Sequence, residues 1–297
     1  MADRPAIEVE HLTKYYGSTR GVERLSFTVE PGEVFGFLGP NGAGKTTTIR
    51  LLLDLLRPSR GTIRVLGLDP RRDVLEVHRR VGYLPGELAL YERLTGETFL
   101  DMVDALRGER DGRTRRLADR LDLDLTRRIG TLSHGNRQKF GLVLAFAYEP
   151  DLLVLDEPTQ GLDPLVQQEF YALVQEARDR GAAVFLSSHV MPEVERTCDR
   201  VAIVRAGELA AIEDVGHLKT RSVRTVEIHL AGPADAAAFR DLPGVRSAQA
   251  RGDVVVLSVE GSIDPVVKAA ARHEVIDLVT HEPSLEDVFL AFYGGGS

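Results

Sequence analysis

Short apolar runs separated by polar turns open this chain. Residues 7–30 alternate in this way and predict strands, and the runs EVFGFL at 33–38 and GTIRVL at 61–66 predict two more. The Leu- and Ile-rich stretch 46–56 predicts a helix. The pattern then changes, because residues 95–150 carry helical spacing with no clear strand.

Strand patterns return in the second half of the chain, at 152–156, 183–187 and 201–205. A helix predicted at 167–180 separates the first two of these strands, as a crossover between parallel strands requires. Another apolar run follows Ala206-Gly207 and gives a hairpin-like pattern. The sequence therefore predicts an α/β nucleotide domain over residues 1–216, interrupted by a helical subdomain at about 95–150.

A different pattern begins near residue 217. Its predicted elements follow a β-α-β-β-α-β order, with strands at 225–230, 245–250, 254–259 and 275–280 and helices at 233–240 and 264–272. This is the order of the ferredoxin-like fold, so a small α+β accessory domain is expected over 217–293. Ser284 is a good N-cap for a last helix, and residues 294–297 read as a flexible tail.

Composition narrows the possible functions. With 37 Lys and Arg against 45 Asp and Glu, the net charge is −8, which argues against nucleic acid as a partner. The single cysteine, Cys198, cannot form an intramolecular disulfide and suits a reducing cytosol. Residues 1–5 lack the apolar core of a signal peptide, and no apolar run approaches the ~20 residues of a membrane-spanning helix. At a membrane, another chain would have to hold this one.

A glycine-rich loop follows the first buried strand pattern and precedes a predicted helix. It fits the phosphate-binding pattern GxxxxGK[ST] at every position, with Gly39, Pro40, Asn41, Gly42, Ala43, Gly44, Lys45 and Thr46, and Thr47 follows. Gly42 and Gly44 let the backbone wrap a phosphate closely. Lys45 is predicted to reach the β- and γ-phosphates, and the Thr46 hydroxyl to bind Mg²⁺. A ligand-free glycine turn is the alternative.

Two carboxylates, Asp156 and Glu157, end the apolar run that begins at residue 152. Ligands of doubly wound sheets bind at this end of the strands, so Asp156 is predicted to contact Mg²⁺, directly or through water, and Glu157 to activate the attacking water. His189 follows the next predicted strand and is expected at the same edge, where it can contact the γ-phosphate. Alone, an Asp-Glu pair also fits a strand that reaches solvent.

The order of these motifs resembles the ATP-binding subunits of ABC transporters over about residues 7–208. GPNGAGKT looks like their Walker A motif, LLVLDE like Walker B, and LSHGN like the signature loop LSGGQ, with Ser133 and Gly135 kept. Asp163 matches the D-loop and His189 the switch histidine. Tyr16 resembles the aromatic residue that stacks on adenine. The resemblance implies ATP and Mg²⁺ as cofactors, and ATP hydrolysis.

Two motifs depart from the family pattern. His134 and Asn136 replace a Gly and a Gln of the signature loop, and Gly86 stands where the Q-loop Gln is expected, with Glu87 as a possible substitute at the metal. Both variants look like those of export-type subunits paired with ABC-2 permeases, including the antibiotic and drug resistance branch. Such subunits often carry a C-terminal extension like residues 217–297.

The resemblance implies partners and a location. A second copy of the subunit is expected head to tail, with a related second subunit as the alternative, and an ABC-2 permease is expected at the cytoplasmic face of the cell membrane. The apolar cluster of Leu88, Leu90, Tyr91 and Leu94 is predicted either to dock the permease or to pack into the subdomain core. An ABC-type ATPase acting on DNA or ribosomes and a small-molecule kinase are rival functions. ATPases of the first kind usually show two ATPase units, a long coiled-coil insertion or basic arms, and the sequence shows one phosphate loop, no long heptad run and an acidic balance. A kinase would not explain LSHGN or the D-loop.

Overall fold

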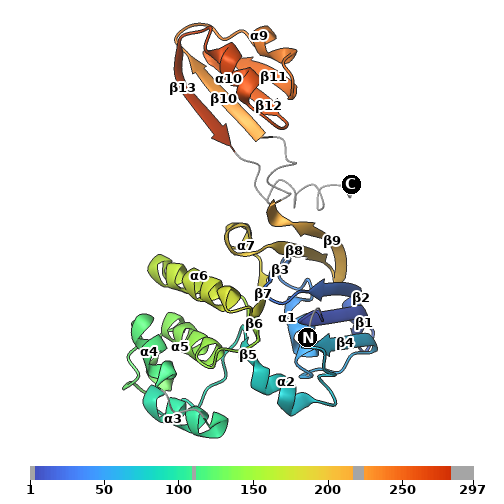
Figure 1. The fold of residues 1–297 in the computed structure, drawn as a ribbon, viewed down its shortest axis with the longest axis vertical. Coiled ribbons are helices and arrows are strands. Elements are labelled where there is room, and N and C mark those ends of the chain that lie inside the picture. The colour runs from blue at the N-terminus through green and yellow to red at the C-terminus, as the bar shows by residue number, and fades with distance from the viewer. Residues whose placement is uncertain (1–3, 109–111, 217–223, 282–297) are drawn as a thin grey trace. The chain divides into compact units, whose positions relative to one another are not determined.

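The computed structural model describes residues 4–108, 112–216 and 224–281 (Figure 1). It divides the chain into two compact units, residues 1–212 and 213–297. The first holds two sheets and seven helices among its described residues, and the second holds one sheet with two helices. In the part of the chain that the structure describes, no helix is long and apolar enough to cross a membrane.

A six-stranded sheet forms the centre of the first unit. In spatial order its strands are β5 (Val81–Leu84), β6 (Leu152–Asp156), β7 (Ala183–Ser188), β3 (Val34–Leu38), β8 (Arg200–Arg205) and β9 (Glu208–Asp214). The pairs from β5 to β8 are all parallel. Every residue of β3, β6 and β7 is buried, because helices and a second sheet cover both faces. This explains why these strands are apolar apart from Asp156, Ser187 and Ser188 at their carboxyl ends.

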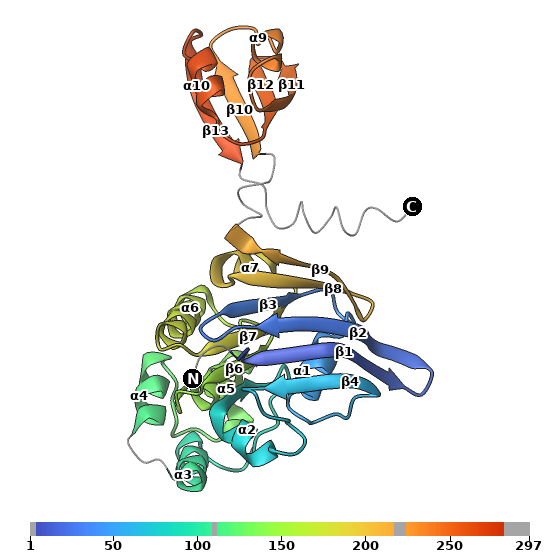
Figure 2. The same cartoon turned by 45° about the vertical axis from the view of Figure 1, so that its right-hand side comes forward.

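A second, antiparallel sheet packs on the same core. It consists of β1 (Ile7–Tyr16), β2 (Thr19–Val29) and β4 (Arg60–Val65) in the order β2-β1-β4, and Figure 2 shows its strands side by side. Phe27 of β2 stacks on Phe35 of β3 with ring centroids 5.6 Å apart, and on Phe185 of β7 at 5.9 Å. These rings join the two sheets into one core. The sequence predicted the strands but not their separation into a sheet of their own.

Seven helices complete the first unit: α1 (Lys45–Leu52), α2 (Val74–Arg80), α3 (Gly96–Arg107), α4 (Arg113–Arg120), α5 (His134–Phe146), α6 (Pro164–Asp179) and α7 (Met191–Thr197). The segment from α3 to α5 contains a short 3₁₀ turn, Ile129–Thr131, and no strand among its described residues, as predicted for 95–150. Side-chain caps fix three of the helix starts. Thr95, Ser133 and Asp163 each accept a backbone N–H of the first turn.

The second unit has the β-α-β-β-α-β order that its sequence predicts. Its elements are β10 (Arg224–Leu230), α9 (Ala237–Arg240), β11 (Val245–Arg251), β12 (Val254–Val259), α10 (Asp264–Ala270) and β13 (Val275–His281). The sheet order β11-β12-β10-β13 is antiparallel throughout and is that of a ferredoxin-like fold. Helix α9 has only four residues, so the helix predicted at 233–240 is too long. The helix expected from Ser284 lies outside the described residues.

Three elements of the first unit were not predicted from the sequence: α2, β5 and α7. The helix predicted at 46–56 ends earlier, at Leu52, because Asp54 takes a left-handed conformation with φ 54°. The other predicted boundaries lie within a few residues of those in the structure.

Candidate functional site

A cavity of about 640 Å³ lies where the carboxyl ends of β3, β6 and β7 meet. Its lining contains many of the residues that the sequence singles out, from segments far apart in the chain: Tyr16, Asn41, Gly42, Gly44, Lys45, Thr46, Thr47, Glu87, Asp156, Glu157 and His189. The parallel pairing of β3, β6 and β7 brings these segments together, since parallel strands end at one edge of a sheet.

At Gly44 the glycine-rich loop approaches its neighbours too closely for a side chain. Gly44 has φ 104°, and a Cβ built on it would lie 2.6 Å from Val22 Cγ1. Lys45 opens α1 and is buried, with 6% of its surface exposed. Its Nζ donates to the carbonyl oxygens of Gly39 at 2.6 Å and Pro40 at 3.2 Å. The loop therefore folds around its own ammonium group, at the positive end of a helix.

Asp156 gathers hydroxyl groups at the end of β6. Thr46 Oγ1 donates to its Oδ2 at 2.8 Å, and Ser187 Oγ donates to its Oδ1 at 2.5 Å. Asp156 is 1% exposed, so these bonds hold the carboxylate in one orientation. A carboxylate beside a threonine hydroxyl is an oxygen donor set of the kind that Mg²⁺ uses, with water and phosphate supplying the other ligands. Among the described residues there is no cluster of three acidic, His or Cys side chains that could hold a metal ion unaided.

Glu157 lies between a cation and an imidazole. Its Oε1 is 3.2 Å from Lys45 Nζ, and its Oε2 is 2.8 Å from His189 Nδ1. The residue has φ 51°, which is uncommon outside glycine, and its N–H donates to the carbonyl oxygen and the Oγ of Ser187, both at 3.2 Å. Strained backbone of this kind concentrates at functional sites. The carboxylate is thus held in a polar pocket between the glycine-rich loop and the residue after β7.

The two neighbouring tyrosines face different surroundings. Tyr16 lines the large cavity, is 45% exposed and has its hydroxyl 3.5 Å from Thr47 Oγ1. Tyr15 instead donates to Glu23 at 3.0 Å and lines another cavity. Of the pair, Tyr16 is therefore the one available to stack on a ligand in the large cavity.

Gly86, which stands where the Q-loop Gln is expected, lies beside Asp156. A Cβ built on Gly86 would be 3.3 Å from Asp156 Oδ2.

Six predicted site residues do not line this cavity. Gly39, Pro40 and Ala43 belong to the glycine-rich loop beside it, and the other three lie on different segments. Ser133 caps α5 by accepting the Asn136 N–H at 3.3 Å, and Asp163 caps α6 by accepting two N–H groups at 3.0 Å. Gly135 packs against the loop after β6, because a Cβ built on it would be 2.8 Å from the Gly161 carbonyl oxygen. Within one chain, the structure does not bring these residues to the cavity that Lys45 lines.

Comparisons with known proteins agree with this arrangement. The family model described as ABC transporter matches residues 22–160. The bacitracin transport ATP-binding protein of Bacillus licheniformis is 32% identical, over 98% of each chain. The daunorubicin/doxorubicin resistance ATP-binding protein of Streptomyces peucetius is 35% identical, over 97% of this chain and 92% of its own. This chain belongs to the ABC transporter family, as an ATP-binding subunit.

Solved structures match about 70% of this ABC subunit. An ATP-binding subunit of an ABC transporter is 31% identical with a TM-score of 0.67, over 72% of this chain and 92% of that chain. A dimeric ATP-binding cassette in a post-hydrolysis state, bound to ADP and Pi, is 19% identical with a TM-score of 0.65, over 70% and 98%. The second match supports the fold alone. The ABC subunit described here is accordingly an ATPase with the P-loop fold that its sequence predicts.

Sequence reasoning missed two polar residues that shape this ATPase site. Ser187 orients both Asp156 and Glu157, and Gln138 of α5 donates to the carbonyl oxygens of Glu157 at 3.3 Å and Pro158 at 3.0 Å. Ser187 is fully buried and Gln138 nearly so. A polar residue at the end of an apolar strand was the available signal for Ser187. Through these bonds Gln138 connects α5, the helix that follows the signature loop, to the segment after β6.

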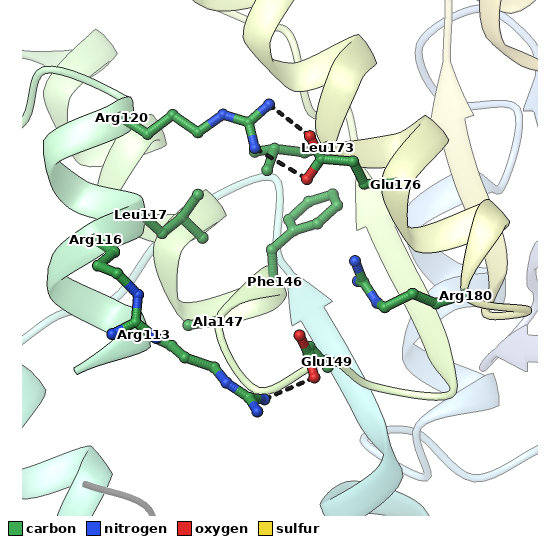
Figure 3. A pocket seen from close by; sticks show the side chains of 10 residues that line it. All are labelled: Arg113, Arg116, Leu117, Arg120, Phe146, Ala147, Glu149, Leu173, Glu176 and Arg180. Carbon is green, nitrogen blue, oxygen red and sulfur yellow. Dashed lines mark hydrogen bonds and ion pairs between the residues drawn. The ribbon is translucent and has the colours of Figure 1, made fainter. Parts of the chain in front are cut away.

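A second cavity, of about 250 Å³, lies between α4, the end of α5 and α6 (Figure 3). Several arginines line it, and ion pairs engage at least two of them. Arg120 lies 2.8 Å from Glu169 and from Glu176 of α6, and Arg113 lies 2.7 Å from Glu149. These pairs tie α4 to α6 and to the end of α5. The cavity therefore lies at a joint between the helical subdomain and the core of the ABC unit.

An apolar groove runs between the core and the helical subdomain, near β5. It has a volume of about 310 Å³, and its lining combines side chains from the core and from the helical subdomain, among them Leu53, Leu55, Tyr83, Phe99, Val103 and Leu144. A smaller apolar pocket of about 260 Å³ lies at Tyr91, Leu94 and Met102. Tyr91 is 65% exposed and Leu55 is 53% exposed. Both residues therefore expose apolar surface, Leu55 at the groove and Tyr91 at the smaller pocket.

Proposed function

We propose that this ATPase subunit powers the export of a drug, antibiotic or lipid-like molecule through a separate ABC-2 permease, and that it works at the cytoplasmic face of the cell membrane. The observation that carries the proposal is the convergence of Lys45, Asp156, Glu157 and His189 on one cavity. The full-length match to bacitracin transport and daunorubicin/doxorubicin resistance proteins supports the substrate class. A separate permease accords with the lack of a membrane-spanning helix among the described residues.

The roles of the site residues follow from their positions. Backbone N–H groups of the glycine-rich loop and the Lys45 ammonium bind the β- and γ-phosphates, and Tyr16 stacks on the base, which contributes about 1–3 kcal/mol. Glu157 orients and deprotonates the attacking water, and His189 holds the γ-phosphate end of the site. Because Glu157 contacts Lys45 at 3.2 Å, bound phosphate competes with this carboxylate for the ammonium and frees it to face water.

Magnesium fits the oxygen donors present. Thr46 and Asp156, directly or through water, would hold the ion against the phosphates, and Glu87 lines the same cavity. When bound, Mg²⁺ supplies charge neutralisation at the transferring phosphoryl group. Ser187 contributes by fixing the orientation of the Asp156 carboxylate, so that one of its oxygens stays turned toward Thr46.

The active form is proposed to be a head-to-tail dimer. One chain places Lys45 at the cavity but leaves Ser133, Gly135 and Asp163 outside it. A second copy, turned to face the first, would bring its own Ser133 and Gly135 to the γ-phosphate side of that cavity. ATP bound between the two chains would then favour the closed dimer, and hydrolysis would open it.

The test of site and function uses the full chain with a candidate permease, such as the membrane protein encoded by a neighbouring gene. Glu157→Gln is expected to retain ATP binding and to lower turnover by about 10²–10⁴-fold, because it keeps shape and hydrogen bonding but removes the base. Lys45→Ala is expected to weaken ATP binding itself.

Transport is measured in vesicles that contain both proteins, with bacitracin, daunorubicin and a fluorescent phospholipid as probes. ATP-driven movement of a probe that stops with Glu157→Gln supports the proposal. Equal hydrolysis by wild type and Glu157→Gln would refute the site roles. A third outcome is that the subunit hydrolyses ATP at the wild-type rate but retains no membrane protein and moves no probe. That result would refute the transport role and leave the site roles intact.

A further inference from the structure

Helix α7 carries a buried carboxyl group that the roles above do not use. Glu193 is 2% exposed, and Ser188 Oγ donates to its Oε2 at 2.5 Å. The other oxygen, Oε1, meets no donor in full hydrogen-bond geometry among the residues that the structure describes, although the nearby Thr159 hydroxyl lowers the pKa of this carboxyl group. A buried carboxyl group with an unpaired oxygen disfavours the folded state. Stability therefore does not explain a glutamate at this position, where Leu or Met would fill the same space.

Ser188 links this carboxyl group to the ATPase site. It ends β7 and directly precedes His189, and its Oγ accepts the Val190 N–H at 2.9 Å. The same hydroxyl thus bonds to the residue after His189 and to Glu193. Its bond to Val190 spans the turn that carries the imidazole, and its bond to Glu193 anchors that turn to α7. His189 Nδ1 in turn lies 2.8 Å from Glu157 Oε2.

We infer that Glu193 is a positioning residue that acts through Ser188 to hold His189 at the γ-phosphate end of the site. The inference rests on the proposed roles of His189 and Glu157. His189 is 44% exposed at its side chain, so burial alone does not fix the imidazole. The anchor must come from the backbone turn, and displacements of about 1 Å at a reacting group can cost 10²-fold in rate.

Near neutral pH the Glu193 carboxyl group is divided between its protonated and ionised forms, since its pKa lies close to that pH. Burial raises the pKa of Glu193 to about 7. Glu157, His189, Tyr171 and Cys198 are the titratable groups that face it. Ser188 can donate to either protonation state of the carboxyl group, and also to the amide oxygen of a glutamine. Glu193→Gln is therefore expected to preserve the link that Glu193→Ala removes.

The experiment compares steady-state ATP hydrolysis of the full chain across four single variants and one double. Ser188→Ala and Glu193→Ala are expected to lower kcat by at least about tenfold while KM for ATP changes less than about twofold, because the phosphate loop is untouched. The double variant is expected to be no slower than the slower single one, since both break one link. Glu193→Gln is expected to keep the wild-type kcat.

Glu33→Gln is the matched control. Glu33 is a nearly buried glutamate that pairs with Arg200 at 3.0 Å at the opposite end of the sheet, so its loss affects folding without touching the turn at His189. Wild-type kcat in both Ala variants, or equal losses in Glu193→Gln and Glu33→Gln, would overturn the inference. If Glu193→Ala does not fold, the inference is tested by the other two variants: Ser188→Ala must lower kcat and Glu193→Gln must keep it. Normal turnover in Glu157→Gln, measured alongside, would instead refute the proposed site.

Discussion

Glu157 illustrates how much a single residue depends on contacts that its neighbours in sequence do not reveal. The apolar run before it predicts a strand end, and this was enough to place Asp156 and Glu157 at the sheet edge. Ser187, about 30 positions away, donates to the Asp156 carboxylate and accepts the Glu157 backbone N–H, whereas Lys45 and His189 contact the Glu157 carboxylate. A serine at a strand end has many ordinary roles, so its sequence position alone does not distinguish this one. The structure distinguishes Ser187, because its side chain is fully buried beside Asp156.

The protonation of Glu193 gives a prediction for stability. The unfolded carboxyl group titrates near 4.5, whereas burial raises the pKa in the folded protein to about 7. Between these values the folded state binds more protons, so the free energy of unfolding falls as pH rises through this window and levels off above it. The full effect is on the order of 3 kcal/mol, because each pKa unit corresponds to about 1.4 kcal/mol.

Urea unfolding of the wild type and of Glu193→Gln, at intervals between pH 4.5 and 8, measures this effect. Gln does not titrate, so the difference between the two proteins isolates Glu193. Wild type is expected to be relatively most stable at the acid end and to lose that advantage by about pH 7. A difference that stays constant with pH would contradict the raised pKa.

At the scale of elements, the sequence predicts long or fully apolar segments well and short ones poorly. Strands β3, β6 and β7 are apolar up to the polar residues that end β6 and β7, and all three were predicted. Helix α2 buries only Val77 among its seven residues, so its sequence shows no hydrophobic periodicity that would predict a helix. Whether β1 joins β4 or the central sheet depends on pairings between residues far apart in the sequence, such as Val9 with Ile63. Local pattern does not specify such pairings.

The ion pairs between α4 and α6 give a second prediction. Arg120→Met keeps the apolar part of the side chain and removes the bonds to Glu169 and Glu176. All three side chains are at least one third exposed, so the free energy of unfolding is expected to fall by no more than about 1 kcal/mol at low salt. The loss should shrink in about 1 M NaCl, because salt screens exposed charges.

Chemical denaturation at both salt concentrations measures this loss. Arg115→Met serves as the control, since Arg115 pairs with Asp101 inside the helical subdomain and leaves the joint with α6 intact. Only Arg120→Met is expected to increase proteolysis between the subdomain and the core. Equal cleavage of the two variants would show that Arg120 does not hold the subdomain to the core.

The apolar cluster after β5 divides into two parts, and this gives a third prediction. Leu88 packs inward, because a Cβ built on Gly141 of α5 would lie 2.4 Å from Leu88 Cδ1. Tyr91 is 65% exposed, with its ring 5.9 Å from Phe99. Tyr91→Glu is therefore expected to release the permease in a detergent pull-down while the isolated subunit folds and hydrolyses ATP normally.

Ile276→Glu is the matched control for Tyr91→Glu. Ile276 is 68% exposed but belongs to the second unit, so the substitution adds the same charge to an equally exposed apolar residue. It is expected to leave the permease bound. Retention of the permease by Tyr91→Glu would remove this surface from the interface, and loss of folding would show that Tyr91 belongs to the core.

At the scale of the whole molecule, the order of motifs predicts the fold of each unit, but a single chain does not assemble every motif. Ser133 and Gly135 remain outside the cavity that holds Lys45. In a head-to-tail dimer each site combines the phosphate loop of one chain with the signature loop of the other. Defects in the two loops should then complement each other when they lie on different chains, which a site built within one chain does not allow.

The last prediction uses Ser133→Asp and Lys45→Ala. Asp caps a helix as well as Ser does, so α5 is expected to persist, while the added charge repels the phosphate of ATP. Each variant alone is expected to lack ATP-dependent dimers and turnover. Mixed together, the chains can form a dimer in which one site carries both defects and the other carries none, so light scattering and phosphate release should both recover in part. The double variant Ser133→Asp, Lys45→Ala, mixed with either single variant, leaves no intact site and is the control. If the two single variants stay monomeric and inactive when mixed, while wild type dimerises in ATP, the shared site is wrong.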